Sequence, residues 1–207
     1  MPSRSIRIAA ATAAAAAVAG AGLFTAGQSA AAEPSATAPG FLEPAELPPH
    51  PSSSWQAGDV STGLPDPRPF CLDDAMPSGD RTWHRTYSTD LDTGATQVSV
   101  SLGSEQKAAK LAAKLRKGYT NCTDEWLADY PEGTASWKDY GKVDAQDGAQ
   151  VYGTYTALPE SSHNVHLFGV GRDGATVTVV SWGQIGTLED APVADFKDTV
   201  RTAVNKL

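Results

Sequence analysis

The stretch NVHLFGVGRDGATVTVVSW, residues 164–182, decides the fold. Its last part, Ala175 to Trp182, is rich in Val, Thr and Trp, which are residue types that favour β-strands. Asn164 to Arg172 has the composition of a second strand, and Asp173-Gly174 between the two runs is typical of a tight hairpin turn. The stretch therefore predicts two antiparallel strands that are neighbours in one sheet.

Patterns on both sides of this hairpin predict more strands and two helices. The further strand runs are Arg81 to Thr89, Ala95 to Leu102, Thr134 to Val143 and Ala149 to Leu158. Ser104 can cap a helix that starts at Glu105, and Asp190 with Pro192 opens a final amphipathic helix. The order β-β-α-β-β-β-β-α predicts an α+β fold, in which two amphipathic helices cover one face of an antiparallel sheet of about six strands.

The first 32 residues have the order of a secretory signal peptide. Arg4 and Arg7 form a short basic start, the apolar run Ile8 to Thr25 follows, and Ala30-Ala31-Ala32 offers a small-residue cleavage site. The apolar run consists mostly of Ala and Gly, and no later segment is apolar enough to span a bilayer. We therefore expect cleavage after Ala32 and secretion of a protein without a membrane span.

The segment after the leader is rich in proline. Ten of the 14 prolines lie between residues 34 and 77, and proline disfavours regular helix and central strand because it removes a backbone donor and fixes φ. Residues 33–54 are predicted to form a flexible lead-in, and residues 55–207 one α+β domain whose packing begins at Trp55. Part of the lead-in is expected to dock on the domain through its apolar positions. These are Phe41, Leu42 and Leu47.

Cys71 and Cys122 are the only two cysteines of the chain. An even pair in an oxidising compartment is expected to form a disulfide, and the alternatives are two free thiols or an intermolecular bridge. The closed loop would contribute about 4 kcal/mol in the chain-entropy model. If the first helix continues past Gly118, Cys122 lies on its buried face, and the bond ties the proline-rich segment to the end of the helix.

The chain is acidic, with a net charge of −8 that becomes −10 when the leader is removed. An acidic surface argues against general nucleic-acid binding. The first helix nevertheless carries a basic stripe at positions i, i+3, i+7 and i+10. Its members are Lys107, Lys110, Lys114 and Lys117. This lysine stripe is either a solvated helix face or a contact for an anionic envelope polymer, a lipid head group or a partner protein.

Several motif-like patterns do not fit a cofactor or metal site. Gly169 to Gly174 matches GxGxxG, but a strand follows it where a dinucleotide site needs a helix. His163 and His166 are three residues apart in a predicted strand, so their side chains point to opposite faces. The sequence contains no HExxH, CxxC or GxSxG motif. We therefore expect no cofactor, no metal site and no catalytic residue that a motif identifies.

Tryptophans and histidines are the candidate ligand-binding residues. Trp126 and Trp137 flank the stretch Leu127 to Ser136, which we expect to be irregular, and loops on a rigid scaffold often carry recognition. His84 and His166 are added because an imidazole in a cleft can change its charge near neutral pH. The same two histidines, together with nearby Asp residues, are the first suspects of an alternative function, a secreted hydrolase whose site is assembled from distant residues.

The layout of the chain resembles a known family. A proline-rich lead-in precedes Trp55 and Cys71, a β pair surrounds Arg81-Thr82-Trp83, a helix ends near Cys122, and a later strand run contains His166-Leu167-Phe168-Gly169-Val170-Gly171. In these features residues 41–207 resemble the PknH-like extracellular sensor domains of actinobacteria, although the better-known members have two disulfides and this chain can form one. The resemblance implies an α+β domain with a cleft that binds a small or polymeric ligand.

The leading functional hypothesis is a secreted, non-enzymatic, sensor-like domain that binds an unknown small-molecule or envelope-polymer ligand. It rests on an exported domain with five tryptophans and no catalytic signature. The alternatives are the hydrolase and a protein-interaction module that uses the lysine stripe.

Overall fold

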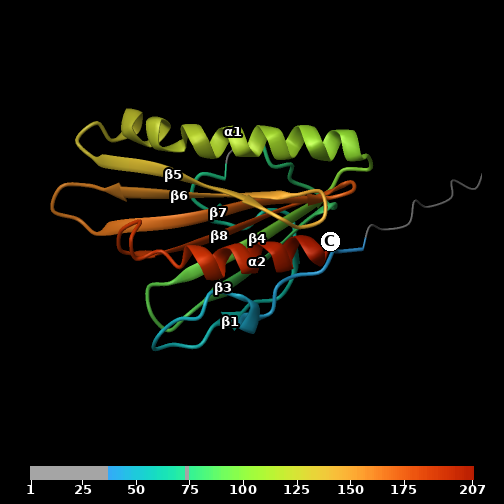
Figure 1. Cartoon of the computed structure of the whole chain (residues 1–207), viewed down its shortest axis with the longest axis horizontal. Coiled ribbons are helices and arrows are strands. Elements are labelled where there is room, and N and C mark those ends of the chain that lie inside the picture. The colour runs from blue at the N-terminus through green and yellow to red at the C-terminus, as the bar shows by residue number, and fades with distance from the viewer. Residues whose placement is uncertain (1–36, 73–74) are drawn as a thin grey trace, which may run out of the picture. The chain divides into compact units, whose positions relative to one another are not determined.

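The computed structural model describes residues 37–72 and 75–207, so the predicted signal peptide, residues 1–32, lies outside the described residues. The described chain forms an antiparallel sheet flanked by two long helices (Figure 1). The strands are β1 (Gln56–Ala57), β2 (Ser61–Thr62), β3 (Thr82–Ser88), β4 (Gly94–Ser101), β5 (Thr134–Val143), β6 (Ala149–Ala157), β7 (His163–Asp173) and β8 (Thr176–Ile185). The helices are η1 (Pro44–Glu46, a 3-10 turn), α1 (Glu105–Asp129) and α2 (Val193–Asn205).

The sheet has eight strands instead of the six that the sequence predicts. Its order is β1-β3-β4-β8-β7-β6-β5, and β2 also pairs with β3. The six longer strands lie where the sequence predicts them, while β1 and β2 add two residues each along the outer edge of β3. Segments this short show no hydrophobic period, which explains why the sequence did not identify them. The β7–β8 hairpin turns at Gly174 and Ala175, because Asp173 still pairs with Thr176.

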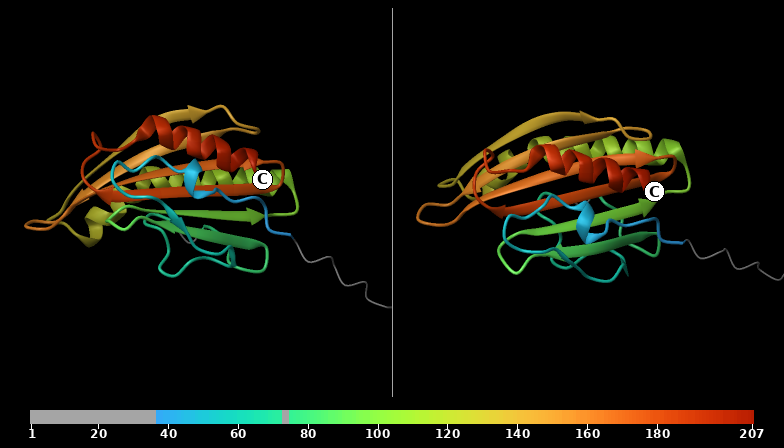
Figure 2. Two further views of the ribbon diagram at one scale, coloured as in Figure 1. Left: turned by 90° about the horizontal axis from the view of Figure 1, so that it is seen from below. Right: turned by 60° about the horizontal axis from the view of Figure 1, so that its bottom comes forward.

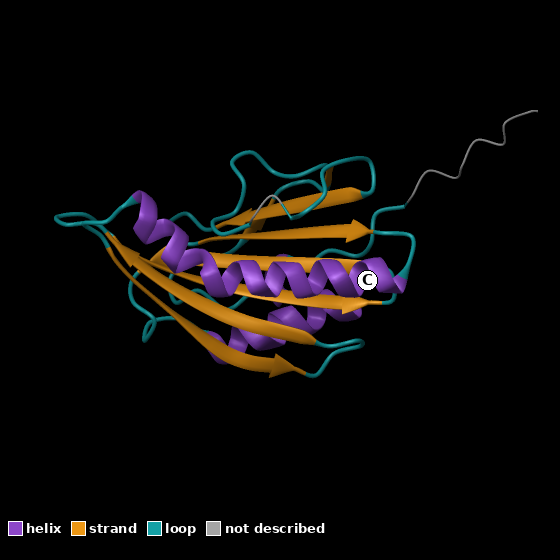
Figure 3. Cartoon of the chain, turned by 90° about the horizontal axis from the view of Figure 1, so that it is seen from above, coloured by secondary structure: helices purple, strands orange, loops and turns teal. Residues whose placement is uncertain are grey.

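The two helices pack on opposite faces of the sheet, and the prediction that both cover one face is wrong (Figures 2 and 3). Side chains alternate along β8, so that Val177 and Val179 join the core under α1, whereas Val180 and Trp182 join the core under α2. The central strands therefore bury both of their faces, and the fold has a helix layer, a sheet layer and a second helix layer.

Two glycines of β7 let α2 approach the sheet closely. A Cβ atom at Gly169 would overlap the methyl groups of Val200, and one at Gly171 would overlap a methyl group of Val204. Both valines are fully buried in the core under α2. The GxGxxG match is therefore a packing feature of a hairpin, since β8 follows it directly.

Helix α1 begins where the sequence predicts and continues past the glycine that weakened its pattern. The Ser104 hydroxyl accepts a hydrogen bond from the Lys107 backbone N–H, which caps the first turn. The helix runs through Gly118 to Asp129, and Cys122 lies on its buried face as predicted. No helix within the described residues is long and apolar enough to cross a membrane.

The proline-rich segment wraps around the β3 edge of the sheet (Figure 2). We call residues 40–72 and 75–76 the wrap. Its first part packs Leu42 and Leu47 into the core under α2, and its last part packs Leu72 into the core under α1. The docking predicted for the lead-in is therefore confirmed, and packing begins well before Trp55.

Two links hold the wrap in place. The predicted disulfide between Cys71 and Cys122 is confirmed, with the Cα atoms 5.7 Å apart, and it ties the wrap to α1. On the other face, the Leu42 backbone N–H donates to the Oε1 atom of the fully buried Gln97 at 2.8 Å. The Tyr87 hydroxyl donates to the Leu42 carbonyl oxygen at 2.9 Å. The wrap is thus an integral part of the domain on both faces of the sheet.

Candidate functional site

An open depression of about 360 Å³ lies on the α1 face of the sheet, where the wrap meets the ends of β7 and β8. Two rows of cross-strand neighbours form its floor. The first row is Thr86, Thr96, Ser181 and Phe168, and the second is Gly94, Gly183 and His166. Because the two glycines stand side by side and have no side chains, the surface of the sheet is hollow at this point.

The His166 ring lies over Gly183 in this depression. A Cβ atom at Gly183 would lie 2.5 Å from His166 Nδ1, so this position of the ring requires a glycine below it. The ring of Phe70 in the wrap packs against His166 with 4.7 Å between ring centroids, and Phe168 stacks beside it at 6.1 Å. Aromatic rings and bare backbone therefore hold the imidazole in place.

His166 is uncharged at neutral pH, because burial lowers its pKa to about 4. Within residues 37–72 and 75–207 no group hydrogen-bonds to either ring nitrogen. A neutral imidazole can donate one hydrogen bond and accept another. The depression thus combines aromatic surface with mostly uncharged hydrogen-bonding groups and one carboxyl group, that of Asp92, which is the usual character of a small-molecule pocket.

The lining does not hold a nucleophile–base pair among the residues that the structure describes. The Ser181 hydroxyl donates to the Thr96 carbonyl oxygen at 3.4 Å, and Asp92 Oδ2 accepts the Ile185 backbone N–H at 2.8 Å. Nucleophilic catalysis needs a hydroxyl bonded to a base that a third group orients. In the described chain there is also no group of three His, Cys, Asp or Glu residues that could hold a metal ion.

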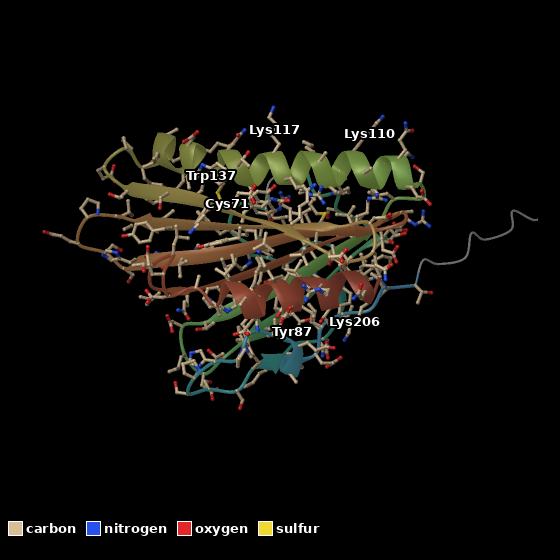
Figure 4. All side chains as sticks on the ribbon, in the orientation of Figure 1. Cys71, Tyr87, Lys110, Lys117, Trp137 and Lys206 are labelled. Carbon is tan, nitrogen blue, oxygen red and sulfur yellow. A yellow bond between two sulfur atoms is a disulfide. The ribbon has the colours of Figure 1, made fainter. Side chains whose placement is uncertain are left out.

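The four candidate ligand-binding residues do not share one site. His166 alone lines the depression. His84 lies in β3 with its Nδ1 atom 2.9 Å from the carbonyl oxygen of Gly63. Trp126, in the last turn of α1, packs against Tyr130, which directly follows the helix. Trp137 lies in β5 at the opposite edge of the sheet from β1, with 44% of its surface exposed (Figure 4).

The irregular stretch expected between the two tryptophans is short. Helix α1 continues to Asp129 and β5 begins at Thr134, so only residues 130–133 lie outside regular structure. The expectation of an irregular stretch over residues 127–136 was therefore wrong. Gly118 does not end the helix, because buried residues at helical spacing continue beyond it, at Tyr119, Cys122 and Thr123.

The lysine stripe lies on the outer surface of α1, as its members Lys110 and Lys117 show in Figure 4. Acidic residues occupy the exposed surface near the other end of the helix. These are Asp124, Glu125 and Asp129. This order opposes the helix macrodipole, which favours acidic residues near the N-terminus and basic residues near the C-terminus. The stripe therefore has no stabilising role through the macrodipole.

Sequence reasoning missed three residues that shape the depression. Gly94 and Gly183 are neighbours only because β4 and β8 pair in one particular register, which no local pattern reveals. The position of Phe70 could have been predicted in part from the sequence. Phe70 directly precedes Cys71, and the predicted disulfide to Cys122 places that segment close to the first helix.

No protein-family model and no curated protein sequence matches the chain. Among solved structures, the chain is similar to the crystal structure of the extracellular domain of PknH from Mycobacterium tuberculosis, with a TM-score of 0.45 and 14% sequence identity. The similarity covers 72% of this chain and 84% of the other.

Proposed function

We propose that this chain is an extracellular, non-enzymatic, sensor-like domain that binds a small ligand in the depression around His166. The observation that carries the proposal is the packing of Phe70 against an uncharged, unbonded imidazole that lies over Gly183, beside the cross-strand neighbour Gly94. Open ring surfaces and free hydrogen-bonding groups at one point of a rigid sheet are suited to recognition.

The lining indicates the chemistry of the ligand. Phe70, Phe168 and the imidazole offer ring faces, and the threonine and serine hydroxyls on the floor add hydrogen-bonding groups. The volume of about 360 Å³ lies near the lower end of small-molecule pockets, which span roughly 300–1,000 Å³. We therefore expect a small molecule with an aromatic or apolar face and one or two uncharged polar groups.

The wrap connects the depression to helix α1, so that ligand binding in the depression can change the position of the helix. Phe70 directly precedes Cys71, and the disulfide joins Cys71 to Cys122 in α1. A ligand that displaces Phe70 from His166 would act on α1 through this covalent link. Such coupling is the structural basis that we propose for a sensor role.

The extracellular location and the kinship with PknH-like sensor domains belong to the same proposal. The disulfide supports the location, because such bonds persist in oxidising compartments and are rare in the cytosol. The basic and apolar order of the leader supports export.

A fragment screen tests the proposed site. The probes are a set of monocyclic phenols, anilines and benzamides, added to the domain while the His166 ring signals are followed by NMR. We expect at least one probe to shift these signals in a saturable way. The affinities of His166→Ala and Phe70→Ala are measured from backbone amide signals of the depression, and each should be at least tenfold weaker than that of the unaltered domain.

His163→Ala is the matched control, because His163 lies in the same strand, is exposed and does not line the depression. It should leave the affinity unchanged. Binding that is equally strong in all three variants, or the absence of any saturable shift, would overturn the proposed site. Turnover of an ester, glycoside or peptide panel that is lost in His166→Ala would instead establish the hydrolase.

A further inference from the structure

A second cavity lies between α1 and the β5–β6 hairpin, and it has a different chemical character from the depression. Its volume is about 460 Å³. Arg116 reaches it from the flank of α1, while Lys142 and Gln150 reach it from paired positions on β5 and β6. The hairpin between these strands contributes Asp144 and Asp147. This cavity therefore gathers charged groups where the depression gathers aromatic ones.

In the part of the chain that the structure describes, the Nε atom of Arg116 is buried without a hydrogen-bond partner, and no ion pair joins Arg116 to another residue. The Arg116 charge acts on the Tyr152 hydroxyl, where it opposes the rise in pKa that burial causes. Burying a charged donor without a partner costs free energy, so such groups are normally satisfied. A guanidinium presents its donors as a planar fork that matches the oxygen atoms of a phosphate or carboxylate. The missing partner of Arg116 is therefore expected to be an oxyanion.

The neighbouring charges leave room for such an anion. Lys142 is exposed and forms no ion pair with a described residue. Asp147 already accepts hydrogen bonds from Arg172 Nη1 at 2.7 Å and from the Gly174 backbone N–H at 2.8 Å, so its charge is compensated. Asp144 is the remaining acidic group in the lining, and it would oppose an anion. Two cations thus face one uncompensated carboxylate.

We propose that this cavity binds the oxyanion of a phosphate- or carboxylate-bearing small molecule, with Arg116 as the principal ligand and Lys142 as the second. The cavity is large enough to hold the oxyanion together with the group that carries it. This cavity shares no lining residue with the depression around His166, so a negative result at one site does not contradict the proposal for the other.

The Nε–H signal of Arg116 in a nitrogen-15 spectrum reports binding directly in the unaltered protein. Inorganic phosphate and acetate are titrated separately at constant ionic strength, with sodium chloride making up the difference. A saturable shift with phosphate assigns a phosphate-bearing ligand, and one with acetate alone assigns a carboxylate-bearing ligand. No saturable shift with either probe overturns the proposal.

Matched variants separate a built site from general electrostatics. Arg116→Gln should weaken binding at least tenfold and Lys142→Gln severalfold, whereas Asp144→Asn should strengthen it. Lys117→Gln removes the same charge from the next residue of the same helix, but Lys117 is exposed and does not line the cavity. It should leave the affinity within twofold. Equal losses in Arg116→Gln and Lys117→Gln would overturn the proposal, and a thermal melt of each variant confirms that it is folded.

Discussion

The ring of Phe70 packs against the ring of His166 with 4.7 Å between centroids, and the disulfide-bonded Cys71 follows Phe70 directly. A covalent link to α1 thus positions the side chain that covers the imidazole. The wrap, the sheet and the helix meet at this one contact. The pKa of His166 therefore reports how closely Phe70 of the wrap packs against the imidazole ring.

Removing the Phe70 ring should raise the pKa of His166. Burial is what lowers this pKa to about 4, so Phe70→Ala, which exposes the imidazole, should move it toward its ordinary value of 6.5. An NMR titration of the His166 ring protons measures the change. Phe70→Leu keeps an apolar cover and should give a smaller rise. A pKa that stays near 4 in Phe70→Ala would show that the wrap does not shield the ring.

The low pKa of His166 should make the domain less stable in acid. Between pH 6.5 and 4 the unfolded chain binds a proton at this histidine while the folded chain does not, so the free energy of unfolding falls as the pH drops through that window. The full difference amounts to about 3 kcal/mol, at 1.36 kcal/mol for each pKa unit.

Urea unfolding at pH 7 and pH 4.5 measures this contribution. His166→Gln keeps a neutral hydrogen-bonding side chain and should remove most of the extra loss in acid, whereas His163→Gln, at an exposed position of the same strand, should retain it. An equal loss of stability in the wild type and in His166→Gln would assign the acid sensitivity to other groups.

The close approach of α2 to the sheet should make β7 intolerant of a single methyl group. Gly169→Ala would place a Cβ atom against the methyl groups of Val200, so we expect a loss of about 1–3 kcal/mol of stability from overpacking. Gly94→Ala is the control, because its Cβ would meet only the Tyr87 carbonyl oxygen at an ordinary 3.7 Å. Equal stability of the two variants in urea would mean that α2 shifts outward without cost.

The sequence predicts the local elements of this fold better than their assembly. The six long strands and both helix starts follow from composition, turn residues and the cap at Ser104, all of which act over a few residues. The placement of the helices on opposite faces was missed. Consecutive apolar residues at Leu167-Phe168 and Val179-Val180 do indicate strands that are buried on both sides.

The candidate sites were less accessible to prediction, because they depend on register. His166 was a candidate from the sequence, but the hollow beside it exists only because Gly94 pairs with Gly183 across two strands. The second cavity likewise depends on the pairing of Lys142 with Gln150 and on the flank of α1 that carries Arg116. Distances across strands cannot be derived from local patterns, whereas the disulfide could be predicted from the number of cysteines and the compartment.

Two substitutions in the lysine stripe should have different effects on stability, but similar effects on any binding of an anionic polymer. Lys107 is the third residue of α1, and its backbone N–H already donates to the Ser104 hydroxyl at 3.3 Å. Lys107→Glu would complete a capping box and place a negative charge near the positive end of the macrodipole, so we expect about 0.5–1 kcal/mol of added stability in urea. Lys114→Glu lies in the middle of the helix and should change stability by no more than a few tenths of a kcal/mol.

If the stripe contacts an anionic polymer, both variants should lose retention on dextran sulfate to a similar extent. If Lys107→Glu gains stability while retention of both variants stays unchanged, the stripe is a solvated helix face and the interaction-module alternative is excluded.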